Sequence, residues 1–142
     1  MKKETSIIKT VLVVLICFSS SSESLKILGI FPLNAKSHFV MFERLMKNLA
    51  EKGHEVDVYS HYPLNKPVPN YKDFSLAGSL PLFVNNMSYQ HITEFSDVNM
   101  EIMQKMLGEP VCNLMKNSVF QELFKSTKKY DVVIVEVMQC FF

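Results

Sequence analysis

The chain has 142 residues, with 15 Lys and Arg against 14 Asp and Glu, so its formal net charge at pH 7 is +1. A balanced chain without a basic patch excludes the electrostatic signature of nucleic-acid binding, and we predict no nucleic-acid partner.

The first 24 residues predict a secretory signal peptide. Lysines near the start give a positive charge, residues 11–18 (VLVVLICF) form an apolar run, and residues 19–24 (SSSSES) form a small polar exit. The apolar run is too short for a transmembrane helix, which needs about 20 predominantly apolar residues. We therefore expect a signal peptide at 1–24, one small domain at 25–142, and a location in the secretory pathway.

The mature chain keeps two cysteines, Cys112 and Cys140. Two cysteines do not make a disulfide scaffold, although secretion permits one bridge; a bridge and two buried thiols both stay open. The triplet Asn86-Met87-Ser88 matches the acceptor pattern for N-glycosylation, so Asn86 is predicted to be a glycosylation site on a surface loop.

Residues 25–61 predict a strand, a helix and a second strand. The run LKILGIFPL is apolar and stopped by proline, as in a strand buried on both faces. Ser37 offers a hydroxyl to cap a helix that begins at His38, and Gly53 closes that helix as a left-handed cap. The helix is expected to bury the apolar residues that recur at steps of three and four, which are Phe39, Phe42, Leu45, Met46 and Leu49. The second strand is HEVDVYSH.

The second half of the chain repeats this alternation. Residues 62–82 carry four prolines and little periodicity, which indicates a long irregular surface connection. Helices are predicted at 93–107, 111–114 and 119–125, the last two as separate helices or one kinked element. The β-branched tail YDVVIVEVM predicts another parallel strand.

Alternating strands and helices indicate an α/β fold with a Rossmann-like parallel sheet and flanking helices. In such sheets ligands lie at the carboxyl ends of the strands. His38 follows the first strand and Glu136 ends the last one, so topology predicts both at the same sheet edge. From the residues alone, a histidine near a helix start is more often a polar surface residue than a functional one.

Two segments resemble one family. Residues 27–64 (ILGIFPLNAKSHFVMFERLMKNLAEKGHEVDVYSHYPL) and 120–136 (FQELFKSTKKYDVVIVE) are similar to the amino-terminal domain of UDP-glycosyltransferases of the glucuronosyltransferase type, especially the invertebrate branch. The similarity is weaker between about 66 and 110. The resemblance implies the amino-terminal, Rossmann-like half of a two-domain GT-B fold, here truncated.

The resemblance also implies an activity. Members of this family transfer a hexosyl group from a UDP-sugar to a small lipophilic acceptor with inversion, at the endoplasmic reticulum membrane or in its lumen, often in detoxification. The amino-terminal domain holds the acceptor and the carboxyl-terminal domain holds the nucleotide sugar. We expect this chain to be an incomplete acceptor-binding domain without the donor-binding domain or membrane anchor, and inactive alone. Membrane association is expected only for a full-length form, and an oligomer stays open.

The family pattern assigns roles to four residues. His38 matches the catalytic base, and Glu136 matches the acidic partner that orients it, although the family more commonly has aspartate there. Asn34 and Ser37, beside His38, are candidates to contact substrate. UDP is a good leaving group, so the resemblance implies no metal and no cofactor beyond the UDP-sugar co-substrate.

Other residues stay without a catalytic assignment. His54 and His61 match no catalytic motif, and His91 stays unassigned. The methionines and phenylalanines between residues 83 and 107 fit either an acceptor pocket or an ordinary core. The alternative function is a non-catalytic secretory module that binds a lipophile or a full-length partner, because we expect the chain to lack a donor-binding domain.

Overall fold

A computed structural model describes residues 23–83 and 108–136. The predicted helix at 93–107, the predicted glycosylation site Asn86 and nearly all of the predicted signal peptide lie outside these residues. The elements in chain order are β1 (Lys26–Phe31), α2 (Lys36–Glu51), β2 (Glu55–Ser60), β3 (Tyr71–Ser75), α5 (Glu109–Asn113), the 3-10 helix η2 (Leu114–Lys116), α6 (Ser118–Lys125) and β4 (Val132–Val135).

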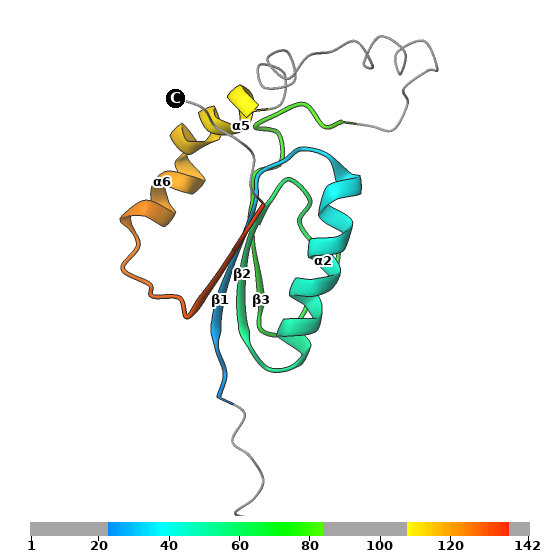
Figure 1. Ribbon diagram of the computed structural model, residues 1–142, viewed down its shortest axis with the longest axis vertical. Coiled ribbons are helices and arrows are strands. Elements are labelled where there is room, and N and C mark those ends of the chain that lie inside the picture. Colours follow the sequence, from blue (N-terminus) through cyan, green and yellow to red (C-terminus); the bar gives the residue numbers. More distant parts are fainter. Residues whose placement is uncertain (1–22, 84–107, 137–142) are drawn as a thin grey trace, which may run out of the picture.

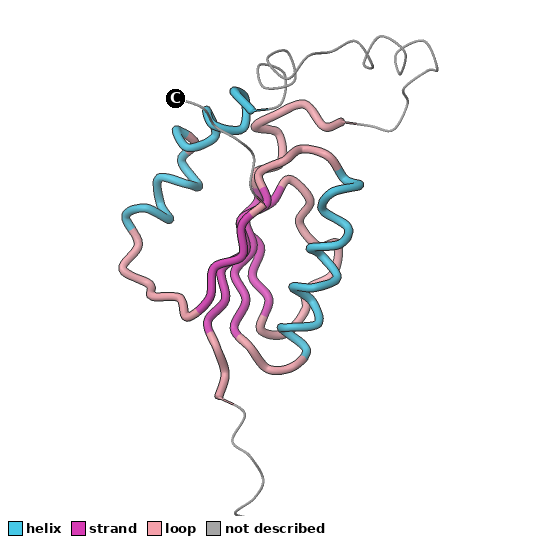
Figure 2. The backbone as a smooth tube through the Cα atoms, in the orientation of Figure 1, coloured by secondary structure: helices cyan, strands magenta, loops and turns pink. Residues whose placement is uncertain are grey.

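The four strands form one parallel sheet in the order β3-β2-β1-β4. β1 is central: Ile27 pairs with Val56 of β2 on one side and with Val132 of β4 on the other. Helix α2 covers one face of the sheet, and α5 and α6 lie on the opposite face (Figures 1 and 2). This arrangement confirms the predicted α/β fold with a Rossmann-like parallel sheet and flanking helices.

Helix α2 packs on the sheet through an aromatic and aliphatic core. Phe39 and Met46 of α2 are buried, as predicted from their spacing, and Ala50, which the prediction did not include, is buried as well. The ring of Phe31 at the end of β1 stacks on Phe42 of α2, with centroids 4.4 Å apart. This contact fixes the helix over the carboxyl end of β1, where the loop to α2 begins.

Leu45 departs from the predicted buried stripe, because its side chain is 43% exposed. In a helix with 3.6 residues per turn, consecutive side chains point about 100° apart, so Leu45 and Met46 cannot both face the sheet. Met46 takes the inward position. Leu45 therefore lies beside the buried stripe of α2 and outside the core.

A second core lies on the α6 face of the sheet. The rings of Tyr59 in β2 and Phe74 in β3 stack with centroids 4.4 Å apart, and Phe120 of α6 stacks on Tyr59 at 5.7 Å. β2 is thus buried on both faces, because Val56 and Val58 belong to the α2-side core and Tyr59 to this one.

The predicted irregular connection at 62–82 is wrong in part, because it contains β3. Residues 71–75 (YKDFS) lack the alternation of apolar and polar residues that marks a strand, and prolines precede them. The strand is stabilised by its pairing with β2, from Val56 with Tyr71 to Ser60 with Ser75, and lies at a sheet edge among the described strands. A short edge strand of this kind leaves little periodicity in its sequence.

The start of α2 also differs from the prediction. The helix begins at Lys36, and its N-cap is Ala35, with no side-chain hydrogen bond to the first turn. Ser37 is exposed within that turn, so the prediction that its hydroxyl caps a helix starting at His38 is wrong. At the other end, Gly53 has the predicted left-handed conformation with φ of +93°.

The helices before β4 are separate elements, which decides between the two predicted alternatives. Asn117 has extended backbone and accepts a hydrogen bond from the backbone N–H of Val119, so it ends η2 and caps α6. Cys112 of α5 takes part in a disulfide, so the alternative of a free thiol is wrong for this cysteine. No helix in residues 23–83 or 108–136 combines the length and apolar character needed to cross a membrane.

Candidate functional site

The candidate site lies where the strand order of the sheet reverses. After β1 the chain crosses to β2 on one side, and β4 later pairs with β1 on the other side. Loops that leave two strands in opposite directions form a crevice at their carboxyl ends, which is where open α/β sheets bind ligands. The loop from β1 to α2 brings His38 to this edge, and β4 brings Glu136.

His38 and Glu136 contact each other at this edge. Nδ1 of His38 lies 3.3 Å from Oε1 of Glu136. The side chain of His38 is 60% exposed, whereas that of Glu136 is only 9% exposed. The structure therefore brings together the two residues predicted for the dyad, with the carboxylate in the sheet edge and the imidazole toward solvent.

Backbone hydrogen bonds hold both residues of this pair. The N–H of Glu136 donates to the carbonyl of Ile30 at 3.0 Å, which extends the β1–β4 ladder past Val135. The N–H of His38 donates to the carbonyl of Ala35 at 3.2 Å, in the first turn of α2. Since both bonds anchor to the segment 30–35, the separation of the two side chains depends on the conformation of that segment.

The contact with Glu136 favours one tautomer of His38. Because a carboxylate only accepts hydrogen bonds and Nδ1 lies 3.3 Å from Oε1 of Glu136, we expect a neutral imidazole to carry its proton on Nδ1 and its lone pair on Nε2. Nε2 makes no hydrogen bond to any of the described residues. This arrangement can take a proton from a hydroxyl at Nε2 while Glu136 stabilises the positive imidazolium that results.

Asn34 lies beside the dyad, in the loop between β1 and α2, and is buried. Its side-chain nitrogen donates to the carbonyl of Pro81. Its own backbone carbonyl accepts hydrogen bonds from the hydroxyl of Tyr62 at 2.7 Å and from the N–H of Phe83 at 2.9 Å. Asn34 thus ties the loop to two other segments, and a substrate contact by its side chain stays a prediction.

The other predicted site residues divide into two groups. Ser37 is exposed one residue before His38, so a contact with substrate stays a prediction for it as well. Asn86 lies outside the described residues. So does the segment proposed to line an acceptor pocket, from residue 84 to residue 107. Within the described ranges, no group of three histidine, cysteine or acidic side chains is placed to hold a metal ion.

Two residues that matched no motif contact the loop of the site. His61 is 2% exposed, and its Nε2 donates to the carbonyl of Pro32 at 3.0 Å. Burial lowers the pKa of His61, against the opposing effect of the Pro32 carbonyl. Tyr62 follows, and burial raises the pKa of its phenol, which keeps the donor protonated. The sequence signal for both is their position directly after a strand that is buried on both faces.

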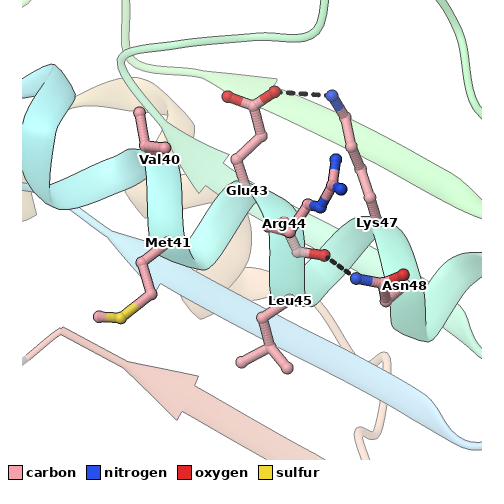
Figure 3. Close-up of a pocket in the computed structure, with 7 residues that line it drawn as sticks. All are labelled: Val40, Met41, Glu43, Arg44, Leu45, Lys47 and Asn48. Atoms are coloured by element: carbon pink, nitrogen blue, oxygen red, sulfur yellow. Dashed lines mark hydrogen bonds and ion pairs between the residues drawn. The ribbon is translucent and has the colours of Figure 1, made fainter.

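A shallow hollow on the outer side of α2 lies apart from the dyad. Its lining comes from a single helix: Val40, Met41, Glu43, Arg44, Leu45, Lys47 and Asn48. Figure 3 shows the ion pair between Glu43 and Lys47, at 2.6 Å, and the hydrogen bond from Asn48 to the carbonyl of Arg44. Neither His38 nor Glu136 lines this hollow, so we assign it no part in the chemistry of the dyad.

The chain is similar to three curated proteins, all from Dactylopius coccus. "UDP-glycosyltransferase UGT5" is 35% identical over 127 residues, which cover 84% of this chain and 24% of that protein. "UDP-glucosyltransferase 2" is 32% identical over 128 residues, covering 87% of this chain and 25% of that protein. "UDP-glycosyltransferase UGT4" is 27% identical over 122 residues, covering 84% and 24%. No family model and no solved structure matches the chain.

The fold and the site define an α/β protein with a histidine–carboxylate pair at the reversal point of a parallel sheet. Together with the similarity over most of its length, this places the chain in the UDP-glycosyltransferase family. The chain spans about a quarter of the length of the curated relatives it matches.

Proposed function

We propose that this chain supplies the acceptor side and the general base of a UDP-sugar-dependent hexosyltransferase that acts on small lipophilic hydroxyl compounds. The observation that carries the proposal is the 3.3 Å contact between His38 Nδ1 and Glu136 Oε1, which leaves Nε2 without a partner among the described residues. The names of the relatives support a UDP-sugar as the co-substrate. The secretory pathway, at the endoplasmic reticulum membrane or lumen, is the proposed location.

In the proposed reaction the acceptor hydroxyl lies against Nε2 of His38. The hydroxyl oxygen attacks the anomeric carbon of the sugar from the face opposite UDP, and its proton passes to Nε2. The new carbon–oxygen bond forms as the bond to the UDP oxygen breaks, and UDP leaves with that electron pair, so the configuration inverts. Glu136 keeps Nδ1 protonated and stabilises the imidazolium, which lowers the barrier to proton transfer.

The proposal divides the reaction between this chain and further sequence. Residues 25–136 would bind the acceptor and provide the base, and a second domain would bind the UDP-sugar. We propose that the 142-residue chain alone does not transfer sugar, and that membrane association belongs to a longer form.

A chimeric enzyme tests this function. Residues 25–136 replace the matching segment of the Dactylopius "UDP-glycosyltransferase UGT5", and transfer from UDP-glucose to a lipophilic phenol is measured. We expect the chimera to be active and His38→Ala to lower kcat by roughly a thousandfold, within the range for loss of a general base.

His54→Ala is the matched control in the chimera. His54 lies just beyond the far end of α2, where its Nδ1 accepts a hydrogen bond from the N–H of Leu25 at 3.3 Å. It should leave kcat nearly unchanged. An active chimera whose rate survives His38→Ala would show that His38 is not the base.

The alternative is a non-catalytic module that binds a lipophile or a protein partner. It is favoured by the exposed apolar side chains of β4, where Val133 and Val135 are 53% and 48% exposed. A chimeric enzyme that binds a lipophilic phenol but transfers no sugar would support it. Sugar transfer by that same chain would refute it.

A further inference from the structure

The segment that carries His38 lacks the usual device for fixing a helix start. Residues 32–35 connect β1 to α2, and the N-cap Ala35 has no side chain that can accept a hydrogen bond from the first turn. The orientation of the first turn must therefore be set by contacts from elsewhere. A misplacement of about 1 Å in a catalytic group can cost a hundredfold in rate, so these contacts bear on the proposed function.

Two consecutive residues after β2 supply hydrogen bonds to this connection. His61 donates from Nε2 to the carbonyl of Pro32 at 3.0 Å, and Tyr62 donates its hydroxyl to the carbonyl of Asn34 at 2.7 Å. The N–H of Tyr62 in turn donates to the hydroxyl of Ser60, the last residue of β2, at 3.1 Å. The sheet thus holds both side chains, and they hold alternate carbonyls of the connection.

Tyr62 also contacts α2 on the other side of His38. Its ring stacks on Phe39, with centroids 5.6 Å apart, and the Lys36 ammonium lies 5.0 Å from the centroid of the same ring. One side chain therefore binds the connection before His38 through its hydroxyl and the helix turn around His38 through its ring. A single tyrosine that contacts both sides of His38 restricts the direction in which the imidazole leaves the helix.

We propose that Tyr62, assisted by His61, is a positioning residue that holds His38 in contact with Glu136. Neither residue touches the reacting atoms in this proposal; each acts through the backbone of residues 32–39. The inference rests on the proposed function for its catalytic consequence, whereas the structural part, the His38–Glu136 contact, can be measured without any substrate.

The first test reads the tautomer of His38 in the full 142-residue chain by ¹H–¹⁵N correlation of the imidazole nitrogens at about pH 8, where a free histidine is neutral. The wild-type chain should show the Nδ1–H form, and Glu136→Ala should convert it to a mixture. Tyr62→Phe keeps the ring but removes the hydroxyl, and we expect it to shift His38 toward the same mixture.

Tyr130→Phe is the matched control, because it also removes one phenol hydroxyl with a short hydrogen bond, to Asp57 at 2.6 Å, among the residues of the α6-side core. It should leave the His38 tautomer unchanged. His61→Phe removes the second bond to the connection and serves as an independent variant if Tyr62→Phe does not fold.

Several results would overturn the proposal. These are a wild-type His38 that is not in the Nδ1–H form, a Tyr62→Phe chain that keeps the wild-type tautomer, or a Tyr130→Phe chain that shifts it equally. In the chimeric enzyme, Tyr62→Phe should lower kcat about fivefold with KM unchanged, and should add little further loss to Glu136→Ala. Failure of His38→Ala in the chimera would remove the proposed function but not the tautomer result.

Discussion

His38 meets Glu136 at 3.3 Å because one strand, β1, pairs with both β2 and β4. His38 follows β1 directly, through four connecting residues and the first turn of α2, whereas Glu136 belongs to the far end of the described chain. The register of β4 on β1, with Ile30 opposite Val135, sets how far the carboxylate reaches. Chemistry at this edge therefore depends on strand register as much as on side-chain identity.

Glu136→Asp should weaken the dyad, although the resemblance described above implies aspartate at this position. The side chain shortens by one carbon–carbon bond, about 1.5 Å. The backbone cannot follow easily, because the Glu136 N–H is held by Ile30 at 3.0 Å. We expect kcat of the chimeric enzyme to fall about tenfold, with Glu136→Gln as the comparison. A rate equal to wild type would show that the strand end can move.

Acid should destabilise the chain through His61. Burial lowers the pKa of His61 in the folded state, so between its folded and unfolded pKa values the unfolded chain binds more protons. The stability contribution is therefore present above about pH 6.5, the usual histidine pKa, and is lost as pH falls below it.

His61→Gln isolates this contribution in the 142-residue chain. The glutamine amide can still donate to the Pro32 carbonyl but does not titrate. Urea unfolding between about pH 5.5 and 7.5 should show a smaller loss of stability toward acid in the variant than in the wild type. Parallel curves for the two chains would contradict the assignment.

The two ion pairs that Lys128 makes at the opposite end of the sheet, with Asp57 and with Glu55, should contribute unequally to stability. Asp57 of β2 is 2% exposed and accepts hydrogen bonds from Lys128 and Tyr130, each at 2.6 Å. Lys128→Met leaves a buried carboxylate with one partner fewer, and we expect a loss of about 3 kcal/mol in the free energy of unfolding.

Glu55→Gln is the control for this pair, since Lys128 also binds Glu55 at 2.8 Å, but the Glu55 side chain is 48% exposed. The exposed pair should contribute no more than about 0.5 kcal/mol. Urea unfolding of the two variants measures the difference. Equal losses would mean that burial of Asp57 does not govern the interaction.

Gly29→Ala should loosen the packing of α2 on β1. A Cβ at this position would lie 2.6 Å from Cε2 of Phe31 and 2.7 Å from Cε of Met46, and both side chains are fully buried. Overpacking of a dense core costs about 1 to 3 kcal/mol. Thermal unfolding should show a lowered Tm, and a Tm equal to wild type would show that Met46 repacks without cost.

Ser37→Ala should leave stability unchanged within about 0.5 kcal/mol, the usual range for a surface substitution. Ser37 is exposed, and the N-cap of α2 is Ala35. A loss near 1 kcal/mol, typical for removal of an N-cap, would show that its hydroxyl does cap the helix. In the chimeric enzyme the same variant tests the predicted contact of Ser37 with substrate through KM.

The sequence predicted the parts of the fold that have strong periodicity. β1, α2, β2 and β4 have apolar runs or stripes long enough to identify their type, and parallel topology then placed His38 and Glu136 at one edge. The contact between His38 and Glu136 followed from where the strands end. The order of strands and helices along the sequence was enough to predict it.

The remainder depends on tertiary contacts that leave little mark on the sequence. β3 is identified by its pairing with β2 rather than by its own residues. Helix α2 begins at Lys36 and not at His38 as predicted, because other segments hold the preceding loop and no capping hydroxyl is needed. The hydrogen bonds of His61 and Tyr62 to that loop require a fold in which the ends of β1 and β2 are adjacent, so no local motif could reveal them.

The central position of β1 also sets an order of assembly. Hydrogen bonds at its start span 29 residues on the β2 side, from Leu25 to His54, and 105 residues on the β4 side, from Lys26 to Asp131. Closing the longer loop costs about 1 kcal/mol more in chain entropy. The β1–α2–β2–β3 half is therefore expected to fold first, with β4 adding to it late. His38 would then reach its place early in folding and acquire its carboxylate only in the last step.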